Sequence, residues 1–454
     1  MKKTALALVT ASLLSGCGGG GSDSENLSRP PTTSPSTTTY TYTAVSTNSC
    51  GMTAPQSDAV MLVHNDDFST REVIRADSNG EMAITVTDGD TVNVSVFTTS
   101  QYGEQPATLN ISTYVDADPD AIRKNFVNAG LEDALCECAN ITLSIQNPEI
   151  TNDQVEVIVN DNFVFQPWST DTSSLEYATE VCRAPDGNWP AIPAMIRDAG
   201  NVYSGILTEY ETSGTNVFPV TDLAEPVLVS QGPVSLPDIS LNNFVSIGFR
   251  EGTPLLQESI NSDNYDAAFY FTSPALEAVS LTNVVASYDI EINDPDINTV
   301  NVWSNSQRLF NEQPASTVDF NHLDFSSVSA EFENSANLES FDFSGSGAQA
   351  VSLTTFFNDE AGSPVLTWQI NTPASASFAA LDNINLEDSQ HVMLDQMSGP
   401  LSDEVYFSLG IYRFNGASNF SEALQALESA DYRQWSGSVT GMDSITTGFL
   451  MNAE

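Results

Sequence analysis

Basic residues are scarce in this chain of 454 residues, which has 13 Lys and Arg against 60 Asp and Glu, for a net charge of −47. Setting aside residues 1–16 leaves 11 basic residues, a balance of 11 − 60 = −49, with Lys124 as the one remaining lysine. Phosphate backbones and anionic lipids are bound by clustered basic side chains. We therefore expect no nucleic-acid partner, and we interpret the dispersed carboxylates as a source of solubility.

Long apolar runs and catalytic motifs are also missing. After residue 17 no run approaches the ~20 apolar residues that a membrane-spanning helix needs. The chain has three histidines, His64, His322 and His391, and none belongs to a His-Glu-x-x-His motif. His322 has aspartates nearby, but no Gly-x-Ser-x-Gly elbow accompanies it. We expect His64 to be an edge or core residue of a strand, and we predict no enzymatic activity.

The first residues have the features of an export signal. Lys2 and Lys3 precede an apolar stretch, Thr4–Leu14, that is too short to span a bilayer. The stretch ends in Leu-Ser-Gly-Cys, with the cysteine at Cys17. This ending resembles the lipobox of bacterial lipoproteins. The resemblance implies that residues 1–16 are removed as a signal peptide and that Cys17 carries acyl chains, palmitate among them, as a stable anchor.

The residue after this cysteine bears on the destination. In the lipoprotein family an aspartate at that place favours retention at the inner membrane, whereas this chain has Gly18. The resemblance therefore implies the outer membrane of a Gram-negative bacterium, with the periplasmic or surface face left open. Residues 17–49 are rich in Gly, Ser, Thr and Pro, which predicts a flexible tether.

Assigning Cys17 to the lipid leaves an even number of cysteines: Cys50, Cys136, Cys138 and Cys182. An even number in an exported protein indicates two disulfides. A bridge between the two cysteines of the Cys-Glu-Cys sequence would be strained, so Cys50 and Cys182 each pair with one of them. Which pairs with which stays open. A metal site at Cys-Glu-Cys is the disfavoured alternative, because zinc sites more often have two intervening residues.

Short alternating apolar runs separated by turn residues predict a mainly β chain of tandem β-sandwich domains, immunoglobulin-like or transthyretin-like, with few short helices. We place a small sandwich at 50–116, a second, disulfide-linked β domain at 117–228 and a larger, cysteine-free β domain at 229–454. Prolines at 226, 233 and 237 interrupt the strand pattern and suggest the second boundary.

The segment "ADSNGEMAITVTDGDTVNVSVF" predicts two strands joined as a hairpin at Asp88-Gly89, preceded by a turn that ends at Gly80. Within 58–115 this pattern resembles the carboxypeptidase regulatory-like module, a small transthyretin-like sandwich. That resemblance implies a spacer or binding role without an active site. We also expect a short helix within 118–134, where Ile122 and Phe126 are four residues apart, and a late helix capped by Asn419 with Glu422 three residues on.

Two acidic stretches offer the oxygen ligands that calcium prefers. They contain Asp116, Asp118 and Asp120 in one case, and Asp294 and Asp296 in the other. Neither follows the twelve-residue calcium-loop pattern, so we predict no cofactor and keep calcium as a weaker alternative.

Two residue types could serve a glycan. Sixty carboxylates allow many pairs for glycoside hydrolysis, and nothing in the sequence selects one. Tryptophans could stack on sugars, and Trp189, in a Gly/Pro turn, is the best exposed candidate. Trp303, Trp368 and Trp435 are expected in the core.

Taken together, these features predict a membrane-anchored, non-enzymatic envelope lipoprotein that presents β-sandwich domains to a protein or glycan. One alternative is a secreted glycan hydrolase that uses a carboxylate pair. Another is a purely structural envelope module. The oligomeric state is not determined by the sequence.

Overall fold

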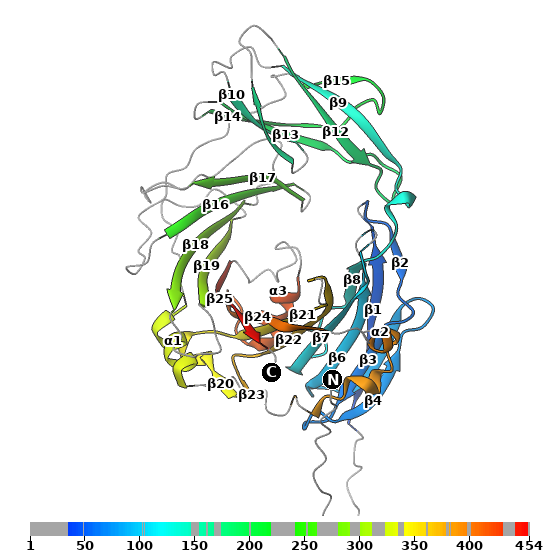
Figure 1. Ribbon diagram of the computed structural model, residues 1–454, viewed down its shortest axis with the longest axis vertical. Helices are drawn as coiled ribbons and strands as arrows, with labels where there is room; N and C mark the ends of the chain where they lie inside the picture. The colour runs from blue at the N-terminus through cyan, green and yellow to red at the C-terminus, as the bar shows by residue number, and fades with distance from the viewer. Residues whose placement is uncertain are drawn as a thin grey trace, which may run out of the picture. The chain divides into compact units, whose positions relative to one another are not determined.

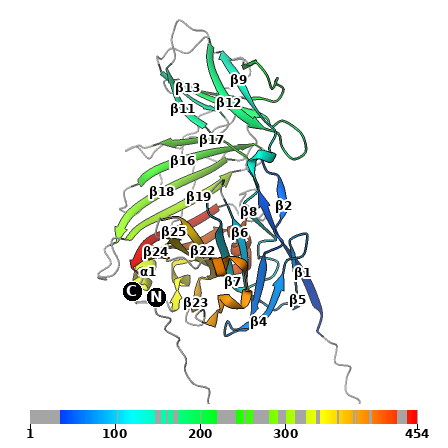
Figure 2. The same ribbon diagram turned by 45° about the vertical axis from the view of Figure 1, so that its right-hand side comes forward.

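The structure is a computed structural model that describes residues 35–452 with gaps. The gaps are 49, 102, 104, 147–153, 160–161, 168–173, 199–200, 219–240, 251–252, 261–279, 291–299, 311–322, 335–339, 360–361, 378–380, 382, 397–400 and 430–440. The chain is mainly β, as predicted (Figures 1 and 2). Within the described parts, no helix is long and apolar enough to cross a membrane.

A β-sandwich occupies the N-terminal part of the described chain. Its first sheet is organised around one strand, which pairs antiparallel with two others and parallel with a third. The four strands are β1 (Thr37–Thr47), β2 (Thr53–Pro55), β5 (Glu81–Thr87) and β8 (Asn125–Ala129). Strand β8 pairs only with β1, so it is an edge strand of this sheet.

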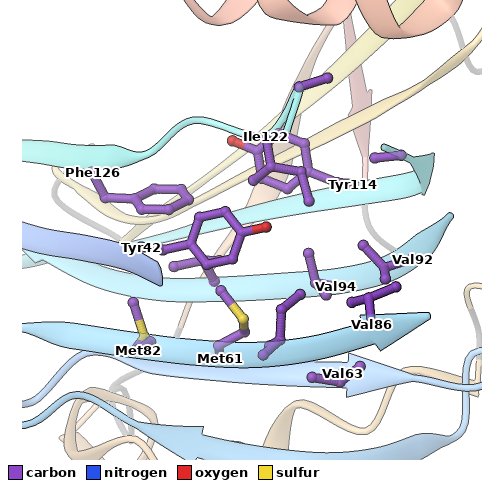
Figure 3. Close-up of a cluster of buried hydrophobic side chains, with 14 of the residues drawn as sticks. Tyr42, Met61, Val63, Met82, Val86, Val92, Val94, Tyr114, Ile122 and Phe126 are labelled. Carbon is purple, nitrogen blue, oxygen red and sulfur yellow. The ribbon is translucent and has the colours of Figure 1, made fainter. Parts of the chain in front are cut away.

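The second sheet of the sandwich runs in the order β4-β3-β6-β7. Its strands are β3 (Val60–His64), β4 (Thr70–Arg75), β6 (Val92–Ser100) and β7 (Thr108–Ala117). Apolar side chains from the two sheets meet in one core, where Tyr42, Met82 and Phe126 of the first sheet face Met61 and Tyr114 of the second (Figure 3). Successive side chains of a strand point to opposite faces, so alternate residues supply this core; in β3 the other set, Val60 and Leu62, packs in a second cluster on the far face.

The predicted hairpin at Asp88-Gly89 is wrong, although both of its strands form. Strand β5 pairs with β1 in the first sheet, whereas β6 pairs with β3 and β7 in the second. The turn therefore carries the chain from one sheet to the other. The apolar sets of the two strands therefore meet in the one core that lies between the sheets.

The preceding turn forms as predicted. Gly80 has a φ of +78° and donates its N–H to Asp77 O at 3.0 Å. The Asp77 carboxylate accepts from the backbone N–H of Asn79 and of Glu81 at 2.8 and 2.9 Å. A side chain at Gly80 would collide with the carbonyl of Ala44, so this position needs glycine for space as well as for backbone conformation.

The sandwich extends beyond the predicted bounds of 50–116 at both ends. Residues 37–47, expected to belong to the tether, form β1, because Tyr42 and Ala44 are fully buried in the core. The helix expected within 118–134 is also wrong over most of its length: 125–129 form β8, and only a short 3₁₀ turn, Asp133–Leu135, is helical. The spacing of Ile122 and Phe126 that suggested a helix instead places both side chains in the sandwich core.

The second sheet of the sandwich continues into the C-terminal half of the chain. Strand β7 pairs in parallel with β22 (Pro364–Pro373), which joins them in a sheet of twelve strands in the order β17-β16-β18-β19-β25-β24-β21-β22-β7-β6-β3-β4. The other C-terminal strands are β16 (Leu241–Arg250), β17 (Thr253–Ile260), β18 (Ser280–Ile290), β19 (Val300–Phe310), β21 (Ala350–Asp359), β24 (Leu401–Asn415) and β25 (Gly441–Asn452). The N-terminal sandwich and the C-terminal strands therefore share one hydrogen-bonded sheet. The domain boundary predicted at 228/229 lies outside the described residues.

Two smaller sheets come from residues 138–218. One has the order β11-β10-β13-β14 and the other β12-β9-β15. Their strands are β9 (Cys138–Gln146), β10 (Gln154–Val159), β11 (Asn162–Pro167), β12 (Ser174–Cys182), β13 (Ile192–Asp198), β14 (Asn201–Leu207) and β15 (Thr215–Phe218).

Short helices, 3₁₀ turns and two short strands cover parts of the twelve-stranded sheet, here called the long sheet. The elements are α1 (Phe325–Asn334), the short strands β20 (Ser340–Asp342) and β23 (Ser375–Ser377), the 3₁₀ turns Phe343–Ser346 and Leu386–Ser389, α2 (Val392–Gln396) and α3 (Phe420–Glu428). Residues 383–396, here called the covering segment, pack Leu386, Met393 and Leu394 on an apolar cluster of β3, β6, β7 and β22. Helix α3 forms as predicted: Asn419 Oδ1 accepts from Glu422 N at 2.9 Å, and the Glu422 carboxylate accepts from Ser418 N at 2.7 Å.

Candidate functional site

A pocket of about 480 Å³ lies between the segment that leads into β8 and the C-terminal end of α3. One wall comes from the stretch between Asp120 and Val127, and the other from Gln425, Glu428 and Ser429. Its volume falls in the range of about 300–1,000 Å³ that is common for small-ligand sites. The pocket therefore has room for a small molecule or for one group of a larger partner.

Local packing determines which side chains reach this pocket. Ala121 and Ile122 are buried in the sandwich core, while Tyr42 donates its hydroxyl to Pro119 O at 2.9 Å. These contacts hold the turn before β8 against the sandwich. The next two residues, Arg123 and Lys124, then lie in the pocket wall with partly exposed side chains.

Arg123 is positioned by a buried carboxylate. Its Nε donates to Glu428 Oε2 at 2.7 Å, and the other Glu428 oxygen accepts from Asn371 Nδ2 at 2.8 Å. The Glu428 side chain is 3% exposed, whereas that of Arg123 is 37% exposed. Burial raises the pKa of Glu428, and the Arg123 charge acts in the opposite direction. The carboxylate therefore has both oxygens occupied and is a support for the guanidinium.

Lys124 is held more tightly by the protein itself. Its ammonium donates to Pro119 O at 2.8 Å and lies 3.4 Å from an Asp120 oxygen. It also lies 5.1 and 5.0 Å from the ring centroids of Tyr40 and Tyr42, within cation–π range. Lys124 thus stabilises the turn, while Arg123 is the better candidate for contacting a ligand.

The predicted calcium stretch forms the turn beside this pocket. Asp118 accepts from the backbone N–H of Asp120 at 2.9 Å and from the hydroxyl of Ser421 at 3.3 Å. Asp116 has a φ of +49°. The other predicted stretch, with Asp294 and Asp296, lies outside the described residues. Calcium binding stays the weaker alternative to the prediction that the chain has no cofactor.

Two disulfides join the four cysteines: Cys50 to Cys136, and Cys138 to Cys182. The prediction that each member of Cys-Glu-Cys pairs with a distant cysteine is confirmed, and the structure resolves the pairing. Cys138, Cys182 and Glu180 also lie close together, but the two sulfurs are bonded to each other and are not available as metal ligands. Cys17 lies outside the described residues, so its lipidation stays a prediction.

Two of the three histidines are buried where the covering segment meets the long sheet, His64 in β3 and His391 in the segment itself. His64 Nε2 lies 2.9 Å from Ser95 Oγ, which contacts Thr113, and burial lowers the pKa of His64 to about 4. His391 stacks on Phe97, and burial lowers its pKa as well. The prediction of an edge or core position for His64 is confirmed by its 3% exposure. His322 lies outside the described residues.

The tryptophans differ in their surroundings. Trp189 is partly buried, with the guanidinium of Arg183 5.1 Å from its ring centroid, so it is less open than predicted. Trp368 is half-buried against two apolar clusters and donates to Thr113 Oγ1 at 2.9 Å. The structure does not describe the side chains of Trp303 and Trp435.

Sequence reasoning missed the pocket because Arg123, Asn371 and Glu428 are far apart in the chain. One signal was visible: the adjacent Arg123-Lys124 is unusual in so acidic a chain. No sequence pattern indicates that Glu428 is the partner, since that contact depends on α3 packing beside β8.

No protein-family model matches the chain, and no curated protein matches its sequence. Among solved structures, the chain is similar to the Bacillus anthracis TIE protein at 10% sequence identity, over 84% of this chain and 70% of that one, with a TM-score of 0.13. A TM-score of this size does not indicate a common fold.

Proposed function

We propose that this chain is a lipid-anchored, non-enzymatic binding protein of the Gram-negative outer membrane, which presents its β domains to a protein or glycan. The lipobox-like leader with Cys17 supports the anchor. The two disulfides support export, because such bonds persist in oxidising compartments. The resemblance of 58–115 to the carboxypeptidase regulatory-like module is compatible with a binding or spacer role.

The observation that carries the binding role is the pocket beside α3. One of its two basic side chains, Arg123, is held by Glu428, which in turn accepts a hydrogen bond from Asn371, and both of these partners are buried. Such support restricts the guanidinium before a ligand arrives and lowers the entropic cost of binding.

The test uses the mature chain without Cys17, residues 18–454, so that no lipid is attached. It is applied to a glycan panel and to solubilised envelope proteins, with and without calcium. Binding of one class, lost on filling the pocket by Val127→Trp, supports the proposal. Absence of any pocket-dependent binding would favour the purely structural module instead.

The hydrolase alternative is tested on the same glycan panel. Asp120 and Glu428 are the two carboxylates in the pocket wall. Release of shortened sugars by the mature chain, abolished by Glu428→Gln, would overturn the non-enzymatic part of the proposal. Unchanged glycans after prolonged incubation agree with it.

A further inference from the structure

The remaining donors of Arg123 determine what the pocket can recognise. Its Nε donates to Glu428. Among the described residues, none accepts a hydrogen bond from its two terminal amino groups. Two parallel N–H donors in a planar fork match the two oxygens of a carboxylate, which a lysine ammonium does not. The free end of Arg123 therefore suits a carboxylate, as it would a phosphate, and a carboxylate is the planar one of the two.

The rest of the wall is neutral and mixed in character. Asn125, Gln425 and Ser429 supply side-chain amides and a hydroxyl, all at least partly exposed. Val127 supplies an apolar surface that is 50% exposed. Amides and hydroxyls exchange hydrogen bonds with sugar hydroxyl groups, and an aliphatic side chain can pack on the apolar face of a sugar ring.

The large negative net charge does not exclude an anionic ligand at this place. Charges are screened over about 8 Å at physiological ionic strength, so only nearby groups matter. The four charged side chains in the pocket wall pair as Arg123 with Glu428 and Lys124 with Asp120, which balance. The pocket is thus locally neutral before binding, and a carboxylate meets the exposed face of Arg123.

We infer that the pocket between β8 and α3 binds a short saccharide that carries a carboxylate, with the carboxylate on the terminal amino groups of Arg123 and sugar hydroxyls on Asn125, Gln425 and Ser429. This inference rests on the proposed binding function and specifies its ligand class. An acidic peptide could present the same carboxylate, but it would make less use of the three neutral polar side chains.

Calorimetric titration of the mature chain tests the ligand class with three probes: digalacturonate, its methyl ester and a neutral galactose disaccharide. We expect digalacturonate to bind at least tenfold more tightly than either of the other two. The ester keeps the ring and the hydroxyls but loses the charge, so equal affinity for ester and acid would overturn the inference.

Variants tie the binding to this pocket. Arg123→Lys keeps a positive charge beside Glu428 but loses the fork, and we expect at least tenfold weaker binding of digalacturonate. Val127→Trp fills the pocket from an exposed position on an edge strand and should abolish binding. Val73→Trp is the matched control, because Val73 is 40% exposed on β4, the edge strand of the other sheet. Urea unfolding of each variant confirms that the fold is kept.

The failures of the inference and of the proposed function are distinguishable. If digalacturonate does not bind but another glycan or an envelope protein does, and Val127→Trp removes that binding, the ligand class is wrong and the binding function stands. If nothing binds in a Val127-dependent manner, both are wrong. Digalacturonate binding that survives Val127→Trp would place the site elsewhere and overturn the inference.

Discussion

Acid should loosen the contact between the covering segment and the long sheet, because two neutral histidines are buried there. His64 is 3% exposed and His391 2% exposed. The charge of Asp388 raises the pKa of His64. The charge of Asp58 raises the pKa of His391, and the charge of Arg75 lowers it. Burial is the largest influence on the pKa of both histidines and lowers it.

The size of the effect follows from the pKa of His64. The pKa of His64 is about 4 in the folded protein, against the ordinary value of 6.5 for a histidine side chain. Each pKa unit corresponds to about 1.36 kcal/mol, so the difference amounts to roughly 3 kcal/mol. The folded pKa is the lower one, so this contribution to stability is complete above pH 6.5, decreases between pH 6.5 and 4, and is lost below 4. His391 adds to the loss in the same direction.

Urea unfolding at several pH values between 7.5 and 4 measures the effect. The 60 acidic residues also titrate over part of this range, so the wild-type curve alone is not sufficient. His64→Gln removes the titration while keeping a side chain that can hydrogen-bond Ser95. We expect the wild type to lose about 3 kcal/mol more than His64→Gln on going from pH 7.5 to 4.

An NMR titration of the three histidines provides the direct check. The resonance assigned to His64 by the His64→Gln variant should titrate near pH 4 or disappear as the protein unfolds. A His64 pKa of 6 or above, or identical pH dependence of stability in the wild type and in His64→Gln, would show that the buried neutral state is not the cause.

Three further outcomes are expected. Cys17→Ser should release the chain from the membrane fraction, and a variant that stays bound and is processed as before would refute the lipobox assignment. Non-reducing peptide mapping should recover the two disulfides described above, and free thiols in the native protein would contradict the pairing. Their sequence separations of 86 and 44 residues correspond to about 4.6 and 4.0 kcal/mol in the chain-entropy account, so reduction should lower the urea midpoint. Leu424→Ala should cost about 2–5 kcal/mol in unfolding free energy, because this fully buried side chain of α3 packs in the sandwich core, and a change below 1 kcal/mol would argue against that docking.

Local patterns predicted the elements better than their partners. The strands β5 and β6, the turn at Gly80 and the cap at Asn419 all follow from alternation or from side-chain hydrogen bonds within a few residues. The predicted hairpin at Asp88-Gly89 shows the limit of such local patterns. Alternation identifies which residues of a strand are buried, but the pattern is the same whether two strands lie side by side in one sheet or face each other across a core.

Residues 122–126 show the second limit. An apolar pair four residues apart fits one face of a helix, and it fits equally well a turn followed by a strand that buries both side chains. The structure has the latter, because β1 offers an edge with which β8 can pair in parallel. That edge comes from a strand about 80 residues earlier, in a stretch whose composition suggested a tether.

The amino-acid sequence alone was enough to establish a mainly β chain, an acidic charge balance and an even set of cysteines beyond Cys17, because composition and short-range spacing carry those properties. The choice between the possible disulfide pairings, the crossing of β5 to β6 and the meeting of Arg123 with Glu428 needed the tertiary structure. Each of these depends on contacts between segments tens to hundreds of residues apart, and the energy of such contacts comes from burial in a shared core rather than from any local preference.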